Sequence, residues 1–119
     1  MRLTLNQQVI AQVVLENLIQ TKTPVSYAEF ALRLELTGPQ KIHRIIKWLE
    51  QITLEDASKG VPVRASMVFS KLHLGLPSSG FFEFCKEIGL FDWNNEPSRA
   101  QNFIQYQQKA LFSKKTACK

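Results

Sequence analysis

A run of polar and basic side chains in the middle of the chain has the chemistry of a contact with a polyanion. These side chains recur at spacings of three and four residues, on one side of a helix: Gln40, His43, Arg44 and Lys47. Arginine and lysine can contact phosphate groups or guanine, and glutamine can pair with adenine. Residues of these types at this spacing predict a surface that binds nucleic acid.

The other residues that could do chemistry form no catalytic or metal-binding pattern. The two histidines, His43 and His73, are thirty positions apart and make no metal signature. The two cysteines, Cys85 and Cys118, are not in a Cys-x-x-Cys spacing. The adjacent carboxylates at positions 55–56 would diverge by about 100° on a helix, so they do not converge on one substrate atom. We therefore expect no enzyme, no cofactor and no metal ion.

The element that must carry the basic residues is the clearest helix of the sequence, from Pro39 to about Ser58. Its apolar residues follow the i, i+3, i+4, i+7 rule and predict a buried stripe: Ile42, Ile45, Ile46, Leu49 and Ile52. Proline suits the first position of a helix, and Gly60 is a plausible stop. The basic residues are then expected on the outer side.

Two helices are expected before this one. The first, from about Leu5 to Gln20, carries apolar residues at helical spacing: Leu5, Val9, Ile10, Val13, Val14, Leu18 and Ile19. The second, within Val25 to Glu35, begins with a capping box formed by Ser26 and Glu29. A tight turn at Thr37-Gly38 then leads into the long helix.

The chain after the long helix changes character. Apolar and polar residues alternate from Val61 to Ser70, which predicts a strand. Its partner could be residues 71–74, residues 23–26 or a second subunit, because a lone strand leaves its backbone groups unpaired. A short helix from Phe81 to Ile88 and a last helix opened by Asn95-Glu96-Pro97 complete the chain.

The order of these elements is that of a helix-turn-helix followed by a wing. We therefore expect a mainly α (α+β) fold: a winged-helix-like helix-turn-helix with a small β element and additional C-terminal helices. In that design the second helix of the pair enters the DNA major groove. The predicted DNA contacts are Gln40, Lys41, His43, Arg44 and Lys47, with Arg64 and Lys71 near the wing. With four or five phosphates neutralised, log affinity would fall with log salt at a slope of about −4.

Length and charge set limits on this interpretation. The 119 residues suit a single domain, residues 1–113, followed by a basic flexible tail, residues 114–119. The net charge is +5, of which three lysines of the tail contribute +3, so the body carries only +2. The chain has no apolar run long enough to cross a membrane and no signal-peptide pattern at its start, so we expect a cytoplasmic protein that binds no membrane.

Two segments resemble the alkyltransferase-like winged-helix domain: Thr23–Ala31 (TPVSYAEFA) and Lys41–Leu49 (KIHRIIKWL). The resemblance implies DNA binding through this helix pair. The family's Pro-Cys-His-Arg alkyl-acceptor motif has no counterpart, because residues 60–64 read Gly-Val-Pro-Val-Arg. Alkyl transfer is therefore not implied. Residues 42–44, 55–62 and 75–82 are also similar to a set of small uncharacterised bacterial proteins, a resemblance that implies a bacterial or phage origin and carries no known activity.

An alternative function belongs to another class. The modest charge of the body and the 10% of aromatic residues suit a protein-interaction module, for example a phage or mobile-element inhibitor or an immunity-type protein without nucleic-acid binding. Phe91 and Trp93 are the aromatic residues expected at the surface. The strand at Val61 to Ser70 could also join two copies as a homodimer.

Overall fold

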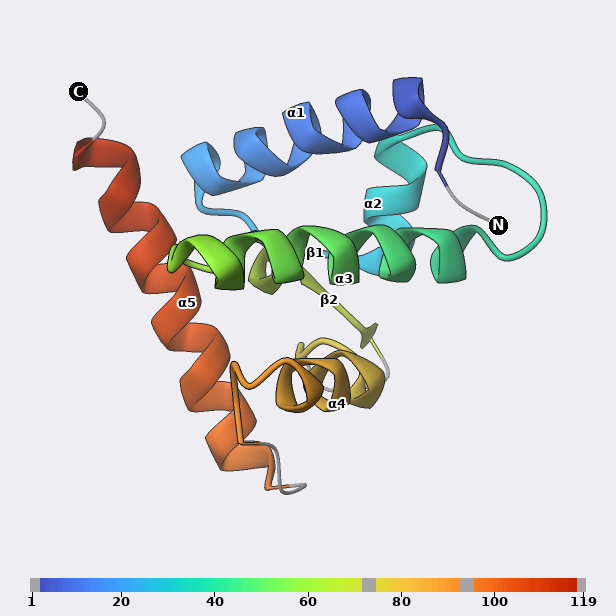
Figure 1. Ribbon diagram of the computed structural model, residues 1–119. Helices are drawn as coiled ribbons and strands as arrows, with labels where there is room; N and C mark the ends of the chain where they lie inside the picture. The colour runs from blue at the N-terminus through green and yellow to red at the C-terminus, as the bar shows by residue number, and fades with distance from the viewer. Residues whose placement is uncertain (1–2, 72–74, 93–95, 118–119) are drawn as a thin grey trace.

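The computed structural model describes residues 3–71, 75–92 and 96–117 of the chain. The described residues form a mainly helical α+β fold, as expected (Figure 1). Its helices are α1 (Leu5–Thr21), α2 (Tyr27–Arg33), α3 (Lys41–Lys59), the 3-10 turn η1 (Arg64–Met67), α4 (Ser79–Glu87) and α5 (Pro97–Ala117). Its two strands are β1 (Val25–Ser26) and β2 (Val68–Phe69).

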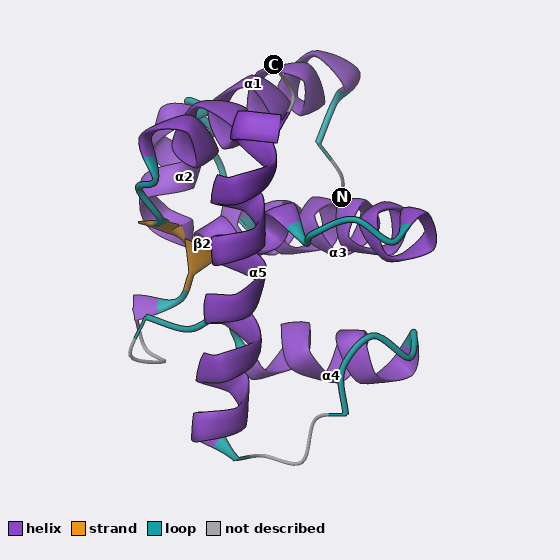
Figure 2. Ribbon diagram, turned by 90° about the vertical axis from the view of Figure 1, so that its left-hand side faces the viewer, coloured by secondary structure: helices purple, strands orange, loops and turns teal. Residues whose placement is uncertain are grey.

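The long helix α3 occupies the centre of the molecule. It lies between α1 on one side and α4 on the other, and α5 crosses the stack near the C-terminal end of α3 (Figures 1 and 2). The space between these helices is filled by fully buried side chains that include Leu15, Phe30, Ile45, Met67 and Phe82. This packing holds α3 by its apolar face and leaves its other face outward.

Helix α1 begins with a complete capping box. The Gln7 amide donates to Thr4 Oγ1 at 3.1 Å, and the Thr4 amide donates to Gln7 Oε1 at 2.9 Å. The side that packs on the core carries Ala11, Leu15, Leu18 and Ile19. The expected apolar stripe is wrong in its first half, because its members there are exposed: Leu5, Val9, Ile10 and Val13. Apolar residues lie on both sides of this helix, so periodicity cannot tell which side is covered.

The connection between α2 and α3 is longer than expected. Ser26 Oγ caps α2 by accepting from the Glu29 amide at 3.1 Å, while the Glu29 carboxylate accepts from Arg33 Nε at 3.1 Å. Residues 34–40 separate the two helices, so the expected tight turn is wrong. Leu36 is buried in the core, which holds this loop to the domain. Gln40 adopts the left-handed conformation, so α3 begins at Lys41 and not at Pro39.

The strand expected over Val61–Ser70 is also largely wrong. Its middle is η1, and only Val68 and Phe69 are extended as β2. Ser66 explains the difference: its amide and its hydroxyl both donate to the Val63 carbonyl, at 3.2 and 2.8 Å, which folds the chain into a turn. β2 pairs in parallel with β1, so the segment at residues 23–26 is the partner among the three candidates left open by the sequence. The alternative partner, residues 71–74, lies mostly outside the described residues.

The last two helices close the core. Phe91, expected at the surface, is half-buried and stacks on Phe103 with ring centroids 4.4 Å apart, because α5 passes over it. Trp93 lies outside the described residues. α5 runs on to Ala117, through the start of the segment expected as a tail. No helix in the described part of the chain is long and apolar enough to cross a membrane.

Candidate nucleic-acid interface

The first two turns of α3 carry basic side chains and no acidic ones. Residues 36–49 contain Lys41, Arg44 and Lys47 but no aspartate or glutamate. Lys41 and Lys47 are exposed, as are Gln40 and His43, and Arg44 is half-buried. Four of the predicted contact residues are therefore exposed on two consecutive turns, and the fifth, Arg44, lies beside them.

The first turn of α3 has no neutralising group. Gln40 precedes the helix in the left-handed conformation, and its side chain makes no capping hydrogen bond. No acidic residue lies in the first turn, although carboxylates are favoured there by the helix dipole. Lys41 adds a positive charge at the same end. Positive charge at the positive end of a helix dipole is unfavourable by itself and becomes favourable when an anion binds.

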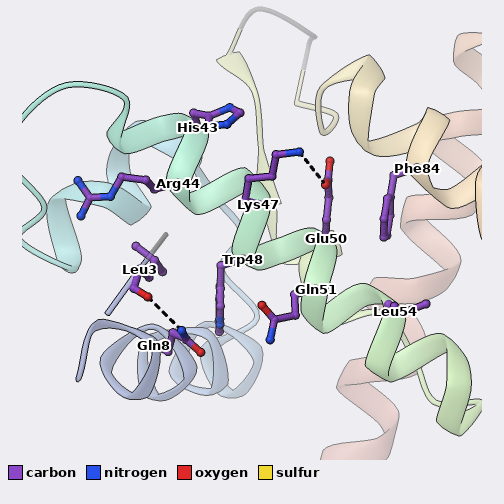
Figure 3. A pocket seen from close by; sticks show the side chains of 10 residues that line it. All are labelled: Leu3, Gln8, His43, Arg44, Lys47, Trp48, Glu50, Gln51, Leu54 and Phe84. Atoms are coloured by element: carbon purple, nitrogen blue, oxygen red, sulfur yellow. Dashed lines mark hydrogen bonds and ion pairs between the residues drawn. The ribbon is translucent and has the colours of Figure 1, made fainter. Parts of the chain in front are cut away.

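Arg44 is held in place by two hydrogen bonds. Its Nη1 donates to the Thr37 carbonyl at 3.3 Å, and its Nη2 donates to Gln7 Oε1 at 3.4 Å. The side chain thus extends toward the α2–α3 loop, whereas His43 and Lys47 extend to the opposite side of the helix (Figure 3). A guanidinium has five N–H donors, so Arg44 keeps donors for a further acceptor.

Lys47 has one carboxylate neighbour. Its Nζ lies 3.8 Å from Glu50 Oε1, one turn farther along α3. The lysine side chain is 55% exposed, and exposed pairs of this kind contribute less than about 1 kcal/mol. A phosphate can therefore compete with Glu50 for this ammonium group.

Of the remaining two predicted contacts, Arg64 is not gathered with the others. Arg64 forms an ion pair with Asp56, with 3.0 Å between Nη2 and Oδ1, and also approaches Glu55 at 3.8 Å. Positions 44 and 56 of α3 are about 18 Å apart along the helix axis. Arg64 is thus bound to the acidic half of α3, and Lys71 is exposed after β2.

A groove runs over the outer side of α3. It has a volume of about 530 Å³ and is bounded by the start of α1 on one side and by α4 on the other. Arg44, Lys47 and Trp48 contribute its floor, while Leu3 and Phe84 come from the two walls (Figure 3). Nothing in the sequence pattern indicates the wall residues, because they are distant in the chain and meet α3 only in the folded molecule.

Comparison of the chain with known protein families, curated proteins and solved structures finds no match. The two resemblances noted in the sequence therefore stay predictions, and the site rests on its own geometry. In the described residues no cluster of three histidine, cysteine or acidic side chains could hold a metal ion.

The thiol of Cys85, on α4, is unsuited to nucleophilic chemistry. Cys85 of α4 is fully buried. Its burial, and then the negative charge of Glu50, raise the pKa of the Cys85 thiol from 9.0 to about 12. Since the thiolate is the reactive form, Cys85 is inert at neutral pH and serves the packing of α4.

Proposed function

We propose that this protein is a non-catalytic DNA-binding protein, with an accessory or regulatory role, that binds duplex DNA through the first half of α3. The proposal rests on four polar or basic residues at the surface of the first two turns of α3: Lys41, His43, Arg44 and Lys47. The first turn of this helix has neither a side-chain cap nor a carboxylate. Charges of one sign on one exposed helix attract a polyanion.

Two kinds of contact are proposed. Lys41, Arg44 and Lys47 bind phosphate oxygens, which supplies most of the affinity. Gln40 and His43 lie at the same helix end, where a helix-turn-helix protein reads base edges. Arg64 is left out of the binding set because its guanidinium is bound to Asp56.

The helix-turn-helix and winged-helix assignments belong to this proposal. The succession of α2, α3 and β2 supports them. The loop of residues 34–40 is longer than the three or four residues usual in a helix-turn-helix, and the β1–β2 pair is parallel. We therefore propose a binding mode dominated by phosphate contacts, with base contacts limited to the first turn of α3.

A charge-reversal pair tests the proposal. Binding of a fluorescent duplex of mixed sequence is measured by anisotropy at low salt for the wild type and for Arg44→Glu/Lys47→Glu. The matched control is Lys86→Glu/Lys109→Glu, which changes two exposed lysines of α4 and α5 by the same charge. We expect at least about a tenfold loss of affinity for the α3 variant and a much smaller loss for the control. Equal affinities of the two variants, or no binding by the wild type, would overturn it.

A second candidate function is a protein-interaction module, and the groove favours it. Leu3, Leu54 and Phe84 give the groove an apolar part beside its basic residues, as in sites that take an amphipathic segment of another protein. Two results together would support this function in place of DNA binding. The protein would change the anisotropy of no duplex, and it would form a stoichiometric complex with a purified protein partner that Phe84→Glu abolishes.

A further inference from the structure

The outer side of α1 is the largest run of exposed apolar side chains on one described element. Leu5 is 80% exposed, Val9 62%, Val13 61% and Ile10 46%. The opposite side of the same helix is buried against the core, and α1 contacts α5 and η1. A helix that is apolar on both sides is typical of an element covered on both sides. The described residues of the chain cover only one of the two sides.

The exposed side chains form a regular ridge. Leu5, Val9 and Val13 follow each other at intervals of four residues, which is the ridge that packs into the groove of a neighbouring helix in the commonest class of helix pair. Beside the ridge lies a groove of about 370 Å³ between α1 and α3, lined in part by Leu5, Val9 and Trp48. Because the same face carries a ridge and a groove, the ridge of one copy can pack against the groove of a second copy.

The low charge of α1 also favours a second copy of the chain as the partner. On α1 itself, from Leu5 to Thr21, the only charged residue is Glu16, and the other polar residues are asparagine, glutamine and threonine. The other side of the groove, on α3 and η1, adds Glu55 and Arg64, which lie 3.8 Å apart as an ion pair of opposite charges. Depletion of charge is characteristic of the centre of protein interfaces. Because the chain carries a net charge of +5, two copies that met through its basic surfaces would repel each other. The α1 face avoids this repulsion.

The area is sufficient for a weak dimer. The four apolar side chains expose on the order of 400 Å², comparable to the largest patch on a typical monomer. Two such faces in contact, with their polar neighbours, would bury roughly 1,000 Å², which is at the lower limit of specific interfaces. The expected affinity is therefore in the micromolar range or weaker.

We propose that two copies of this chain associate through α1, with the Leu5–Val9–Val13 ridge of each packed against that of the other across a two-fold axis near Val9. This interface differs from a pairing through the strand, because β2 pairs with β1 of its own chain. It is also poorly suited to a membrane surface, since α1 carries no lysine or arginine to meet anionic lipids. The proposal does not depend on DNA binding.

Sedimentation of the full chain over a range of protein concentrations tests the dimer. We expect the mean mass to rise from 13.6 kDa toward twice that value as the concentration increases through the micromolar range. Val9→Glu and Val13→Glu should each weaken the association by at least about tenfold. The matched control is Leu32→Glu, which changes a leucine of α2 that is 71% exposed and should leave the association unchanged. Circular dichroism verifies that each variant is folded.

A charge-complementation experiment then tests the symmetry. Val9→Glu and Val9→Lys should each remain monomeric, and their equimolar mixture should recover dimers, because residue 9 faces its own copy across the axis. A wild type that stays monomeric into the millimolar range, or a dimer that tolerates Val9→Glu and Val13→Glu, would overturn the proposal. So would loss of the dimer with Leu32→Glu, or binding of the α1 face to anionic vesicles in preference to itself.

Discussion

Asp56 and Arg64 form a multiply bonded ion pair that joins the last turns of α3 to η1. Asp56 Oδ2 accepts from the Arg64 amide at 3.0 Å, and the Arg64 guanidinium binds both carboxylate oxygens through Nε at 3.1 and 3.2 Å. The Asp56 side chain is only 3% exposed, so Arg64 provides hydrogen bonds that water does not supply there. A residue expected to contact DNA thus holds the end of the long helix to the following turn.

Loss of the Arg64 side chain should destabilise the fold. In Arg64→Ala the buried Asp56 carboxylate keeps the hydrogen bond from the amide of residue 64 but loses the guanidinium, and removing one partner of a buried ion pair typically costs about 3–5 kcal/mol in unfolding free energy. Urea denaturation followed by circular dichroism measures this change. Glu55→Ala is the control, since Glu55 is half exposed and lies 3.8 Å from Arg64, and it should cost less than about 1 kcal/mol. An Arg64→Ala variant as stable as Glu55→Ala would contradict this account of the pair.

The salt dependence of DNA binding should reflect the three cations of α3. With Lys41, Arg44 and Lys47 each neutralising one phosphate, log affinity should fall with log salt at a slope of about −2.7. This slope is shallower than the value of about −4 expected when Arg64 and Lys71 also contribute. Lys41→Ala should reduce the steepness by about 0.9, whereas Lys86→Ala, on the exposed side of α4, should leave the slope unchanged. A wild-type slope near zero would be incompatible with phosphate binding.

The stability of the fold should decrease at alkaline pH because of Cys85. Burial raises the pKa of the Cys85 thiol from 9.0 to about 12, so between these values the unfolded chain loses a proton that the folded chain retains. The unfolding free energy is therefore unaffected below pH 9 and falls above it by up to about 1.4 kcal/mol per pH unit. Burial also raises the pKa of Tyr27 from 10.0, which adds a decrease of the same sign above pH 10.

Denaturation curves of the wild type and of Cys85→Ala between pH 8 and pH 10 measure how much the Cys85 thiol contributes to the pH dependence of stability. Cys85→Ala leaves a cavity, so the unfolding free energy of the variant is lower than that of the wild type at every pH. Above pH 9 the unfolding free energy of the variant should fall less steeply with pH than that of the wild type. Parallel pH profiles of the two proteins would show that the thiol is not the cause.

Gln107 should contribute more to the stability of the fold than the exposed Gln105 on the same helix. Its Oε1 accepts from the buried Val63 amide at 2.9 Å, forty-four residues away in the chain. Gln107→Ala leaves this amide without an acceptor, which should lower the unfolding free energy by about 1–3 kcal/mol. Gln105→Ala, at an exposed position of the same helix, should change it by less than about 0.5 kcal/mol. Thermal unfolding of both variants measures the difference.

Sequence alone was sufficient where structure depends on neighbours in the chain. The Ser26 cap of α2, the outward side of α3 and the end of α4 before Gly89 were all predicted, because helix periodicity and capping bonds act over three to five residues. The basic character of the first half of α3 is equally a property of consecutive residues.

Tertiary structure decided everything that depends on residues far apart in the chain. The side of α1 that is buried, the pairing of β1 with β2 and the groove wall at Phe84 all result from contacts between distant segments. The same holds for Arg64: its charge is visible in the sequence, but its availability depends on a buried carboxylate that only the fold brings within 3.0 Å. Local patterns determine which face of a helix is apolar or basic, and packing determines whether that face is covered.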